Sequence, residues 1–533
     1  MKSNTTTIIY ALVIFILLNL ISNKLFARFD FTQGQIYTLS DATERIVQKL
    51  ENNIDVIVFV SEQLPPQAVS SKTQLVDKLT EFENLSTGRL TITYMDPVTD
   101  ESAEELATAF GVPPLDLQVI EEDQAQVIKA YFGLAVTTPA KTETDTDVND
   151  PLSQYARYEV IPVIESLNGL EFELASAMLK VGSESLKTVA FLQGHGEHSF
   201  ALPAYYAAMN DDPRADYNVS EELSRNYNVT TIDYNTLEEE AKNDPFTGVN
   251  TLIIAGPQQE IPGDELTKIH QFVENGGNAI FLIDSMNVDT QFSFSASRLP
   301  ITYYDLLKPW EVTVNPDIIA DASHDMASFN QGFITYSLPY PFFAKIINLN
   351  QNNTITQDVE SFTMPWTSSL TLGDSDELKY DILASTTDQY QVFTEAATTI
   401  PAEAEGEPDK IQFTPIDLSP QQDFNLRPGQ DPLPLVVLAE KEGIGKVIIA
   451  SDSDFVAQGG IDTLLFYNMV DALTLGDDLI QIRSKGITDR PLEELSNTQK
   501  DTIRWGITLG VPILFIIYGL YRRQKRKQKK ASQ

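Results

Sequence analysis

The sequence predicts an α/β protein whose folded domains lie between two membrane-spanning helices. Three observations lead to this prediction: the chain of 533 residues has an uncharged apolar run near each end, strand-like and helix-like segments alternate between these runs, and 76 acidic residues oppose 37 basic ones. All the acidic residues lie within 22–503, and a basic segment ends the chain. A body with this much negative charge is a poor candidate for binding nucleic acid.

The first apolar run, residues 5–22, predicts a transmembrane helix. The run is uncharged and rich in Ile and Leu, and at about 1.5 Å per residue it covers about 27 Å, enough to cross the hydrocarbon core of a bilayer. A cleaved signal peptide is the alternative, but the residues after the run lack the small-residue pattern of a cleavage site. We therefore expect an uncleaved anchor.

Residues 505–521 predict a second transmembrane helix. The run is uncharged, and Trp505, Tyr518 and Tyr521 lie near its ends, where interfacial aromatic residues are common. A buried core helix is the alternative, but the basic tail 522–533 argues against it. Because Lys and Arg beside a span stay on the cytoplasmic side, we expect both termini in the cytoplasm and the acidic body outside it. The tail either contacts anionic lipid or a cytoplasmic partner, or it only sets this topology.

Residues 28–180 predict an α/β domain with a thioredoxin-like β-α-β-α-β-β order. The expected strands are 54–60, 90–94, 125–128 and 131–136, the last two as a hairpin. The expected helices are one that opens with the capping-box pattern of Asp41 and Glu44, and those at 72–84, 101–110 and 165–180. The polar residues 137–156 predict an exposed loop. Because the chain has no cysteine, thioredoxin-type redox activity is excluded.

Residues 186–475 predict a second domain built on a parallel α/β sheet, because strand and helix signals alternate. The expected strands are 187–192, 228–232, 251–255, 278–283, 433–439 and 446–450, and the expected helices are 217–226, 262–275 and 462–475. Residues 291–430 are rich in Thr, Ser, Pro, Asn and aromatic residues and predict a β-rich insertion, across which a doubly wound sheet closes. Residues 476–504 are expected to be a tether to the second span.

His195, Glu197 and His198 form the first candidate site. They follow a predicted strand on a Gly-rich loop, at the edge where open α/β sheets bind ligands. One hypothesis is ligand binding, another is a metal site completed by a carboxylate such as Asp452 or Asp454, and the third is a turn whose His and Glu hydrogen-bond the neighbouring backbone. The spacing differs from the H-E-x-x-H zinc motif, so no metal or other cofactor is predicted.

Asp452 and Asp454 form the second candidate site, in a Ser-Asp-Ser-Asp segment after a predicted strand. Their carboxylates either bind a cation or a hydroxylated ligand, or cap the next helix or turn.

Motifs for nucleotide binding and catalysis are absent from the sequence. Residues 443–446 read Gly-Ile-Gly-Lys, but Glu440 stands where a P-loop requires its first Gly, and Val447 stands where it requires Ser or Thr. The segment therefore predicts a hairpin turn. The lack of cysteine excludes disulfides, zinc–thiolate sites, iron–sulfur ligation and a Cys-His-Glu triad, and no G-x-S-x-G elbow occurs. Any energy must come from a partner, and no catalytic residue is assigned.

The chain resembles the GldG-type auxiliary proteins of ABC transport systems, a family first associated with gliding motility. The resemblance extends over nearly the whole chain and is carried, in order, by Tyr37-Thr38-Leu39-Ser40, the segment from Val189 to Glu197, the helix end at Gly276-Gly277, Asp452-Ser453-Asp454-Phe455 and Arg490-Pro491-Leu492. It implies a bacterial inner-membrane subunit that works with a separate permease and ATPase. It also implies a central domain similar to class I glutamine amidotransferases and to a domain of intraflagellar transport proteins, without the catalytic Cys.

These observations favour a non-enzymatic, membrane-anchored scaffold or binding subunit of an ABC-type complex, with its main domain in the periplasm. Its spans would lie in the bilayer against permease helices, and its acidic domains would engage a substrate or envelope partner. One alternative is a metal-dependent hydrolase centred on His195, Glu197 and His198. Another is an extracytoplasmic solute-binding receptor that uses a cleft between the two α/β domains.

Overall fold

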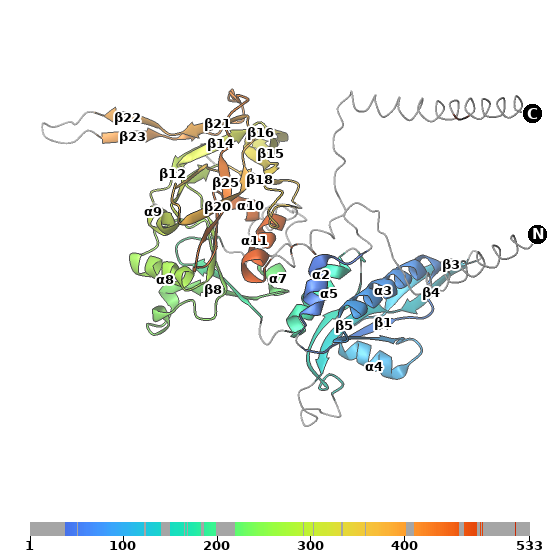
Figure 1. The fold of residues 1–533 in the computed structure, drawn as a ribbon. Helices are drawn as coiled ribbons and strands as arrows, with labels where there is room; N and C mark the ends of the chain where they lie inside the picture. Colours follow the sequence, from blue (N-terminus) through green and yellow to red (C-terminus); the bar gives the residue numbers. More distant parts are fainter. Residues whose placement is uncertain are drawn as a thin grey trace, which may run out of the picture. The chain divides into compact units, whose positions relative to one another are not determined.

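A computed structural model of the chain (Figure 1) describes Tyr518 and residues 38–482, with gaps at 51, 122–123, 140–149, 165, 168, 183–185, 199–218, 291–292, 302, 332–333, 358, 401–409, 458–462, 477–479 and 481. Every described residue except Tyr518 belongs to one compact unit, within Met1–Gly486. Apart from Tyr518, the predicted spans 5–22 and 505–521 and the tail 522–533 lie outside the described residues. Within the described part of the chain, no helix has the length and apolar character needed to cross a membrane.

The N-terminal α/β region is built around a four-stranded sheet. Its strands lie in the order β2 (Leu90–Met95), β1 (Ile54–Val60), β5 (Phe132–Pro139) and β6 (Tyr155–Ile161). β1 pairs parallel with β2 and antiparallel with β5, and β5 pairs antiparallel with β6. The strands predicted at 54–60 and 90–94 are confirmed, and so is the α/β class.

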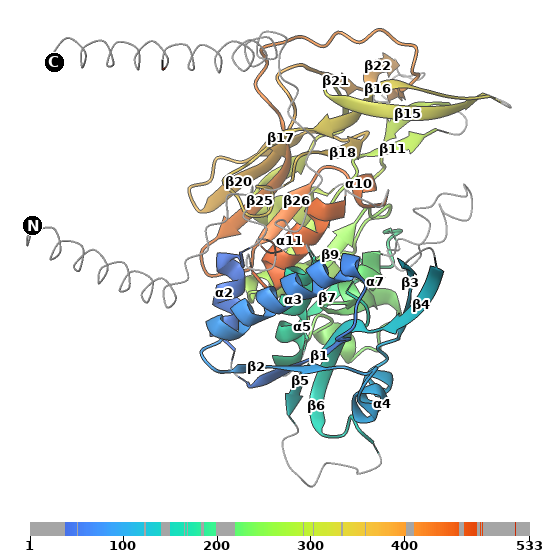
Figure 2. The same cartoon turned by 90° about the vertical axis from the view of Figure 1, so that its right-hand side faces the viewer.

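Helices cover both faces of this sheet because alternate residues of each strand point to opposite sides. The four helices are α2 (Asp41–Gln48), α3 (Pro66–Leu85), α4 (Glu101–Ala109) and α5 (Leu170–Gly182), and Figure 2 shows them beside the strands of this sheet. Val56 and Val58 share a core with α2, α3 and α5, whereas Ile57 and Phe59 pack with Phe110 at the end of α4. Each predicted helix is therefore present, and α3 begins six residues before the predicted start at 72.

The N-terminal cap of α2 lies one residue before the predicted capping box. Ser40, not Asp41, is the cap, and its Oγ atom accepts a hydrogen bond from the backbone N–H of Thr43 at 3.1 Å. The Ser40 N–H and the Thr43 hydroxyl both donate to the buried carboxylate of Glu171, each at 2.7 Å. This carboxylate fixes the start of α2 against α5.

The hairpin predicted from 125–128 and 131–136 is wrong. β4 (Gln124–Ala130) pairs instead with β3 (Leu115–Glu121), which the sequence analysis did not predict, and β5 pairs with β1 and β6. The interior residues of β5 are buried, so this strand belongs inside the sheet rather than in an exposed hairpin. The predicted loop at 137–156 is shorter than expected, since β5 continues to Pro139 and β6 begins at Tyr155.

The central sheet has eight strands in the order β17-β20-β25-β26-β10-β9-β7-β8. From β8 to β26 the neighbouring strands are parallel, whereas β25, β20 and β17 continue the sheet antiparallel. The sheet is thus mixed rather than wholly parallel. The predicted hairpin turn at 443–446 is confirmed, since it joins β25 and β26 as an antiparallel pair. Its strands are β7 (Thr188–Gln193), β8 (Asn228–Asp233), β9 (Thr251–Ala255), β10 (Asn278–Leu282), β17 (Asn348–Leu349), β20 (Leu378–Ser385), β25 (Pro434–Lys441) and β26 (Val447–Ala450).

Helices also cover both faces of the central sheet. One face packs on α7 (Val219–Ser224), α10 (Asp454–Ala457) and α11 (Leu464–Thr474), and the other packs on α8 (Gly263–Glu274), α9 (Tyr304–Leu307) and Trp310. Short 3-10 turns occur at Tyr234–Thr236, Ala241–Asn243 and Lys308–Trp310. Beyond α11, Ile480 and Ile482 are helical and buried, within the stretch predicted to be a tether.

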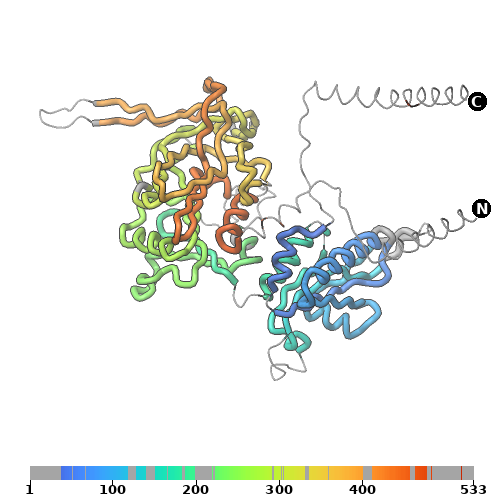
Figure 3. Tube along the Cα trace, in the orientation of Figure 1, coloured from blue at the N-terminus to red at the C-terminus, as the bar shows by residue number. Residues whose placement is uncertain are grey.

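A β-rich insertion lies between β10 and β25 in the chain, in the green to orange part of the trace in Figure 3. Ile318, Phe329, Tyr340 and Phe342 lie in a hydrophobic core of its own. The predicted β-rich character is confirmed, but β17 and β20 from within 291–430 join the central sheet. The remaining strands are β11 (Met286–Asp289), β12 (Ser295–Arg298), β13 (Val312–Val314), β14 (Asp317–Asp321), β15 (His324–Gln331), β16 (Ile334–Ile346), β18 (Phe362–Pro365), β19 (Leu370–Leu372), β21 (Tyr390–Thr394), β22 (Ala396–Ile400), β23 (Lys410–Thr414) and β24 (Ile416–Asp417).

Candidate functional site

Four parallel strands of the central sheet end side by side at the edge that carries the predicted site residues. From β7 the chain goes to β8 on one side, and then to β9, β10 and β26 on the other. This reversal makes the neighbourhood of β7 and β9 a topological switch point, where open α/β sheets bind ligands. The segments that follow these four strands begin at Gly194, Gly256, Ile283 and Ser451.

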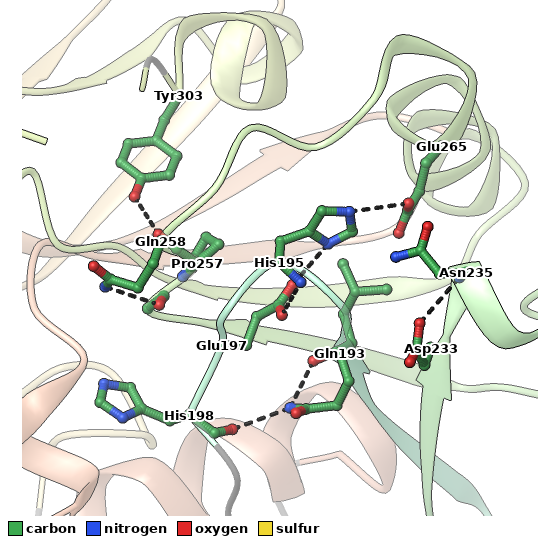
Figure 4. A network of polar contacts seen from close by, with 12 residues as sticks. Gln193, His195, Glu197, His198, Asp233, Asn235, Pro257, Gln258, Glu265 and Tyr303 are labelled. Carbon is green, nitrogen blue, oxygen red and sulfur yellow. Dashed lines mark hydrogen bonds and ion pairs between the residues drawn. The ribbon is translucent and has the colours of Figure 1, made fainter. Parts of the chain in front are cut away.

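His195 is buried between two carboxylates. Its backbone N–H donates to Glu197 Oε2 at 2.7 Å, and its Nδ1 atom lies 3.1 Å from Glu197 Oε1. On the other side of the ring, Nε2 lies 3.3 Å from Oε2 of Glu265, which α8 contributes (Figure 4). This second contact is an ion pair without hydrogen-bond alignment, and neither Glu265 oxygen has a hydrogen-bond partner among the described residues.

The two carboxylates fix the charge of this imidazole. The hydrogen bond with Glu197, and then the contact with Glu265, raise the pKa of His195 to about 10, although burial opposes the shift. Burial raises the pKa of Glu197, but its hydrogen bonds with His195 and the backbone outweigh this and leave the pKa lowered. At neutral pH His195 is therefore a cation. A general base has to be unprotonated, so His195 is not poised for that role.

Two glycines allow the loops at this edge to approach one another. Gly256 has φ +60°, and a Cβ atom there would lie 2.7 Å from both His198 Cδ2 and Ser453 Oγ. Gly194 has φ +118°, and a Cβ atom there would lie 2.9 Å from the Asp233 carboxylate. Positive φ and the missing side chain are both needed at these positions.

His198 points away from His195 and belongs to a second group of side chains (Figure 4). Its Nε2 atom lies 2.7 Å from Ser453 Oγ. The Ser453 hydroxyl donates to Asp284 Oδ2 at 2.5 Å, and the Ser453 N–H donates to Asp284 Oδ1 at 2.7 Å. Since a hydroxyl has one proton to give, His198 is the donor to Ser453, and Asp284 anchors both residues.

Asp452 and Asp454 lie beside this second group. Asp452 is buried; its Oδ1 atom accepts the N–H of Asp454 at 2.9 Å, and its Oδ2 atom has no partner among the described residues. Asp454 Oδ1 lies 3.8 Å from His198 Nε2. Burial raises the pKa of the Asp284, Asp452 and Asp454 carboxyls. Nearby carboxylates raise the pKa values of Asp452 and Asp454 further, to about 7 for Asp454. With a pKa of about 7, Asp454 therefore titrates near neutral pH.

The predicted site residues thus fall into two groups that share no partner in the contacts above. His195 and Glu197 are buried with Glu265, whereas His198 and Asp454 keep 31% and 36% of their side-chain surface exposed. In the part of the chain that is described, no three His, Asp or Glu side chains are arranged to hold a metal ion.

The sequence analysis did not select Glu265, Asp284, Ser453 or Tyr303 as site residues. Asp284 ends a predicted strand, and Ser453 lies between the two predicted aspartates, so their positions at strand ends could have identified them. Glu265 and Tyr303 have no such signal, since each comes from a helical or insertion segment that only the fold brings near. The Tyr303 hydroxyl donates to the Pro257 carbonyl at 2.6 Å, and burial raises the pKa of Tyr303.

Comparison with known proteins finds a family match over the part of the chain that holds this site. Residues 186–471 match a family described as an ABC-type uncharacterized transport system, and residues 33–137 match a domain of unknown function. An uncharacterized protein of Borreliella burgdorferi is 22% identical over 409 residues, which cover 75% of this chain and 73% of that protein.

Two solved structures are similar at low identity. The mmIFT52 N-terminal domain is 14% identical, with a TM-score of 0.33, and the match covers 54% of this chain and 97% of that one. A putative ThuA-like protein from Parabacteroides merdae is 10% identical, with a TM-score of 0.27, and the match covers 58% of this chain and 95% of that one.

Proposed function

Because the chain belongs to the family described as an ABC-type uncharacterized transport system, we propose that it is a non-enzymatic auxiliary subunit of an ABC-type transport complex. The observation that carries this proposal is the family match over 186–471, which spans the central sheet and every predicted site residue. The sequence has no P-loop. In this proposal a separate ATPase supplies the energy, and a separate permease forms the transport path.

The proposed subunit crosses the bacterial inner membrane twice, with both termini in the cytoplasm and the acidic body in the periplasm. The uncharged runs 5–22 and 505–521 support the two crossings, and the basic tail 522–533 supports the orientation. The order of the sequence motifs between the runs supports membership of the GldG-type branch.

The proposed domain folds are thioredoxin-like for 28–180 and glutamine-amidotransferase-like for 186–475. The order β2-β1-β5-β6, with β1 and β2 parallel and the other pairs antiparallel, supports the first. The parallel run β8-β7-β9-β10-β26 supports the second. Since the chain has no cysteine, the first domain cannot carry out thiol redox exchange, and the second has no cysteine nucleophile for amidotransferase catalysis.

Burial and hydrogen bonding at the switch point support a role without catalysis. Ser453 lies within hydrogen-bonding distance of His198, but its side chain is fully buried and its hydroxyl donates to Asp284. A nucleophile has to reach its substrate and give its proton to the base. His195 cannot act as the base either, because its two carboxylate neighbours keep it protonated.

The exposed part of this edge is the proposed recognition surface. His198 and Asp454 are half-buried side chains, each with about a third of its surface exposed, and they lie at the switch point where α/β sheets bind ligands. The buried groups behind them, Ser453 and Asp284, hold His198 in place through two hydrogen bonds. We place contact with a periplasmic partner or with the transported substrate here.

Copurification from native membranes tests the transport assignment. The full-length chain, tagged and extracted in mild detergent, should recover a permease and an ATPase that mass spectrometry identifies. A matched control has the run 505–521 replaced by a poly-Leu helix of equal length, which keeps the anchor and removes its specific packing. Recovery of neither partner by the natural chain would count against the proposal, as would equal recovery by the control.

Reporter fusions test the orientation separately. Alkaline phosphatase, which is active only in the periplasm, should be active when inserted in the polar segment 140–149 and inactive when fused after 533. Green fluorescent protein should give the opposite pattern. Activity in the reverse pattern would refute the proposed placement and leave the partner assignment to be judged by copurification.

A hydrolase is the second candidate, favoured by the 2.7 Å contact between His198 and Ser453. A nucleophile and base at this distance form the core of serine hydrolase sites. If the chain is a serine hydrolase, a fluorophosphonate probe should label the natural chain and should not label a Ser453→Ala variant. An unlabelled natural chain would leave the non-enzymatic proposal in place.

A further inference from the structure

A second candidate binding site lies at the opposite edge of the central sheet, where the parallel strands begin. A hollow of about 660 Å³ is bordered by the 243–250 segment before β9, the last turns of α8 with the Gly276-Gly277 turn, and the end of α11. Its volume lies within the range of about 300–1,000 Å³ typical of small-ligand sites. None of the switch-point residues lines it.

The inner wall of the hollow is held rigidly by two asparagine side chains. Asn250 Oδ1 accepts the N–H of Thr188 at 2.9 Å. Asn278 Oδ1 accepts the N–H of Lys446 at 2.8 Å, and its Nδ2 donates to the Leu473 carbonyl at 2.5 Å. These bonds tie the starts of β7, β9, β10 and β26 to the end of α11, so the wall exists before any ligand arrives. Such preorganisation lowers the entropy cost of binding.

A glycine shapes the side of the hollow next to α8. The ring of Phe272 lies over Gly277, where a Cβ atom would be 2.3 Å from the ring. The ring also packs on Phe246, with centroids 5.4 Å apart. The hollow thus has a fixed apolar patch beside its polar lining.

The outer lining presents polar side chains that have no partner in the described structure. Asn243, Gln271 and Asn275 are exposed, Lys268 is half-buried, and no side-chain hydrogen bond or ion pair joins any of the four to another described residue. Amide groups both donate and accept hydrogen bonds, and an ammonium group donates. This combination matches hydroxyl groups, which also donate and accept.

The charges of the lining favour a neutral ligand. Lys268 contributes one positive charge and Asp244 one negative charge, and the C-terminal end of α8 adds partial negative charge from its carbonyls. The charges of Lys268 and Asp244 cancel, so neither an anion nor a cation gains net attraction from these two side chains. We propose that the hollow binds a neutral, hydroxyl-rich ligand, a saccharide, whose hydroxyls meet the amides while an apolar sugar face lies on Phe272. This inference does not depend on the proposed transport role.

Ligand-observed NMR on the full-length chain tests the proposal. The protein is held in lauryldimethylamine oxide, which carries no sugar headgroup, and saturation transfer is measured to cellobiose, maltose and N,N′-diacetylchitobiose. At least one should show saturation transfer that reaches a plateau as the sugar concentration rises. Glucuronic acid and glucosamine, which carry a negative and a positive charge, should bind no more tightly than the neutral sugars, since the opposite charges of Lys268 and Asp244 cancel in the lining.

Two variants locate the binding, and one controls for fold. Asn275→Trp places a large side chain over the hollow and should abolish saturation transfer. Gln271→Ala removes one hydrogen-bonding group and should weaken the affinity about fivefold. Lys379→Ala, on an exposed lysine of β20, should leave binding unchanged. No transfer to any of the three neutral sugars, or transfer that Asn275→Trp leaves intact, would overturn the proposal.

Discussion

The Nε2 atom of His198 lies 2.7 Å from the Oγ atom of Ser453, although the two residues are 255 positions apart in the chain. His198 follows β7 and Ser453 follows β26, and two strands, β9 and β10, lie between these in the sheet. The contact therefore passes across the ends of both intervening strands. It depends on Gly256, which follows β9 and leaves room for the imidazole. The site is a property of the completed sheet rather than of either loop alone.

We expect Ser453→Ala to lower the free energy of unfolding by about 1–3 kcal/mol, because the buried Asp284 carboxyl loses a donor and His198 loses its acceptor. Urea denaturation of the purified chain measures this. The control is Ser293→Ala, since Ser293 makes an exposed hydrogen bond to Asp289 at 2.8 Å, and the change there should stay within about 0.5 kcal/mol. Equal effects at both positions would mean that burial of the Ser453 contact adds nothing.

Two glycines separate backbone strain from steric conflict. Gly256 and Gly443 have φ +60° and +83°, but a Cβ atom would meet His198 and Ser453 only at Gly256; at Gly443 no atom lies within 4 Å. Each alanine variant should lose about 1–2 kcal/mol from the left-handed conformation. Gly256→Ala should lose about 1–3 kcal/mol more, because the side chains around it are forced apart. Thermal unfolding of the pair measures the difference, and similar melting temperatures would contradict the close packing described here.

His195→Gln should be among the most destabilising single substitutions at this edge, costing about 3–5 kcal/mol, because it leaves Glu197 and Glu265 buried without a cation. The double variant His195→Gln/Glu265→Gln should recover part of the loss, since one of the unpaired charges is gone. If the double variant is less stable than the single one, the 3.3 Å contact is not an ion pair.

The effect of His195 should also depend on pH. Folding raises the pKa of this imidazole from 6.5 to about 10, so its stabilising contribution is fully present below pH 6.5 and is lost as the pH rises through 10. The deficit of His195→Gln should therefore be largest at pH 6 and shrink toward pH 10. Unfolding free energies at pH 6, 8 and 10 measure this trend, and a deficit constant with pH would show that the side chain acts only by packing.

The predictable part of the fold is the part with strong local signals. Strands such as Ile54–Val60 and Thr251–Ala255 are continuous apolar runs, and helices such as Gly263–Glu274 carry both periodicity and end signals, so their positions follow from the chain alone. The β3–β4 hairpin was missed because adjacency in sequence suggested that β4 pairs with β5. Pairing is decided by burial of β5 between β1 and β6, and no local pattern contains that information.

The candidate site was predictable to the same extent. His195, Glu197, Asp452 and Asp454 were identified because they follow buried strands, and the sheet does bring those strand ends to one edge. The division into two groups was not predictable, since it depends on Glu265, which the first turn of α8 brings against His195. The alternation of residues along a strand predicts which side chains are buried. It does not predict which charged residue from another element forms an ion pair with a residue of the site.

Asp317 provides the last test, because its buried carboxyl lies in a hydrogen-bonded network that a conservative substitution can preserve. Its two oxygens accept from the N–H and the hydroxyl of Ser369, at 2.8 and 2.6 Å. Burial nevertheless raises the pKa of Asp317 from 3.8 to about 6. Its contribution to stability is therefore fully present below pH 3.8 and is lost as the pH rises through 6.

In Asp317→Asn one oxygen still accepts the Ser369 N–H, and the amide nitrogen donates to the Ser369 oxygen, so the network remains without a titrating group. Relative to this variant, the natural chain should lose thermal stability between pH 4 and 7, whereas the other carboxyls titrate alike in both proteins and cancel in the comparison. Melting curves that stay parallel across this interval would show that the carboxyl of Asp317 is not desolvated, and that the contact between the insertion strand β14 and the segment before β19 is open to water.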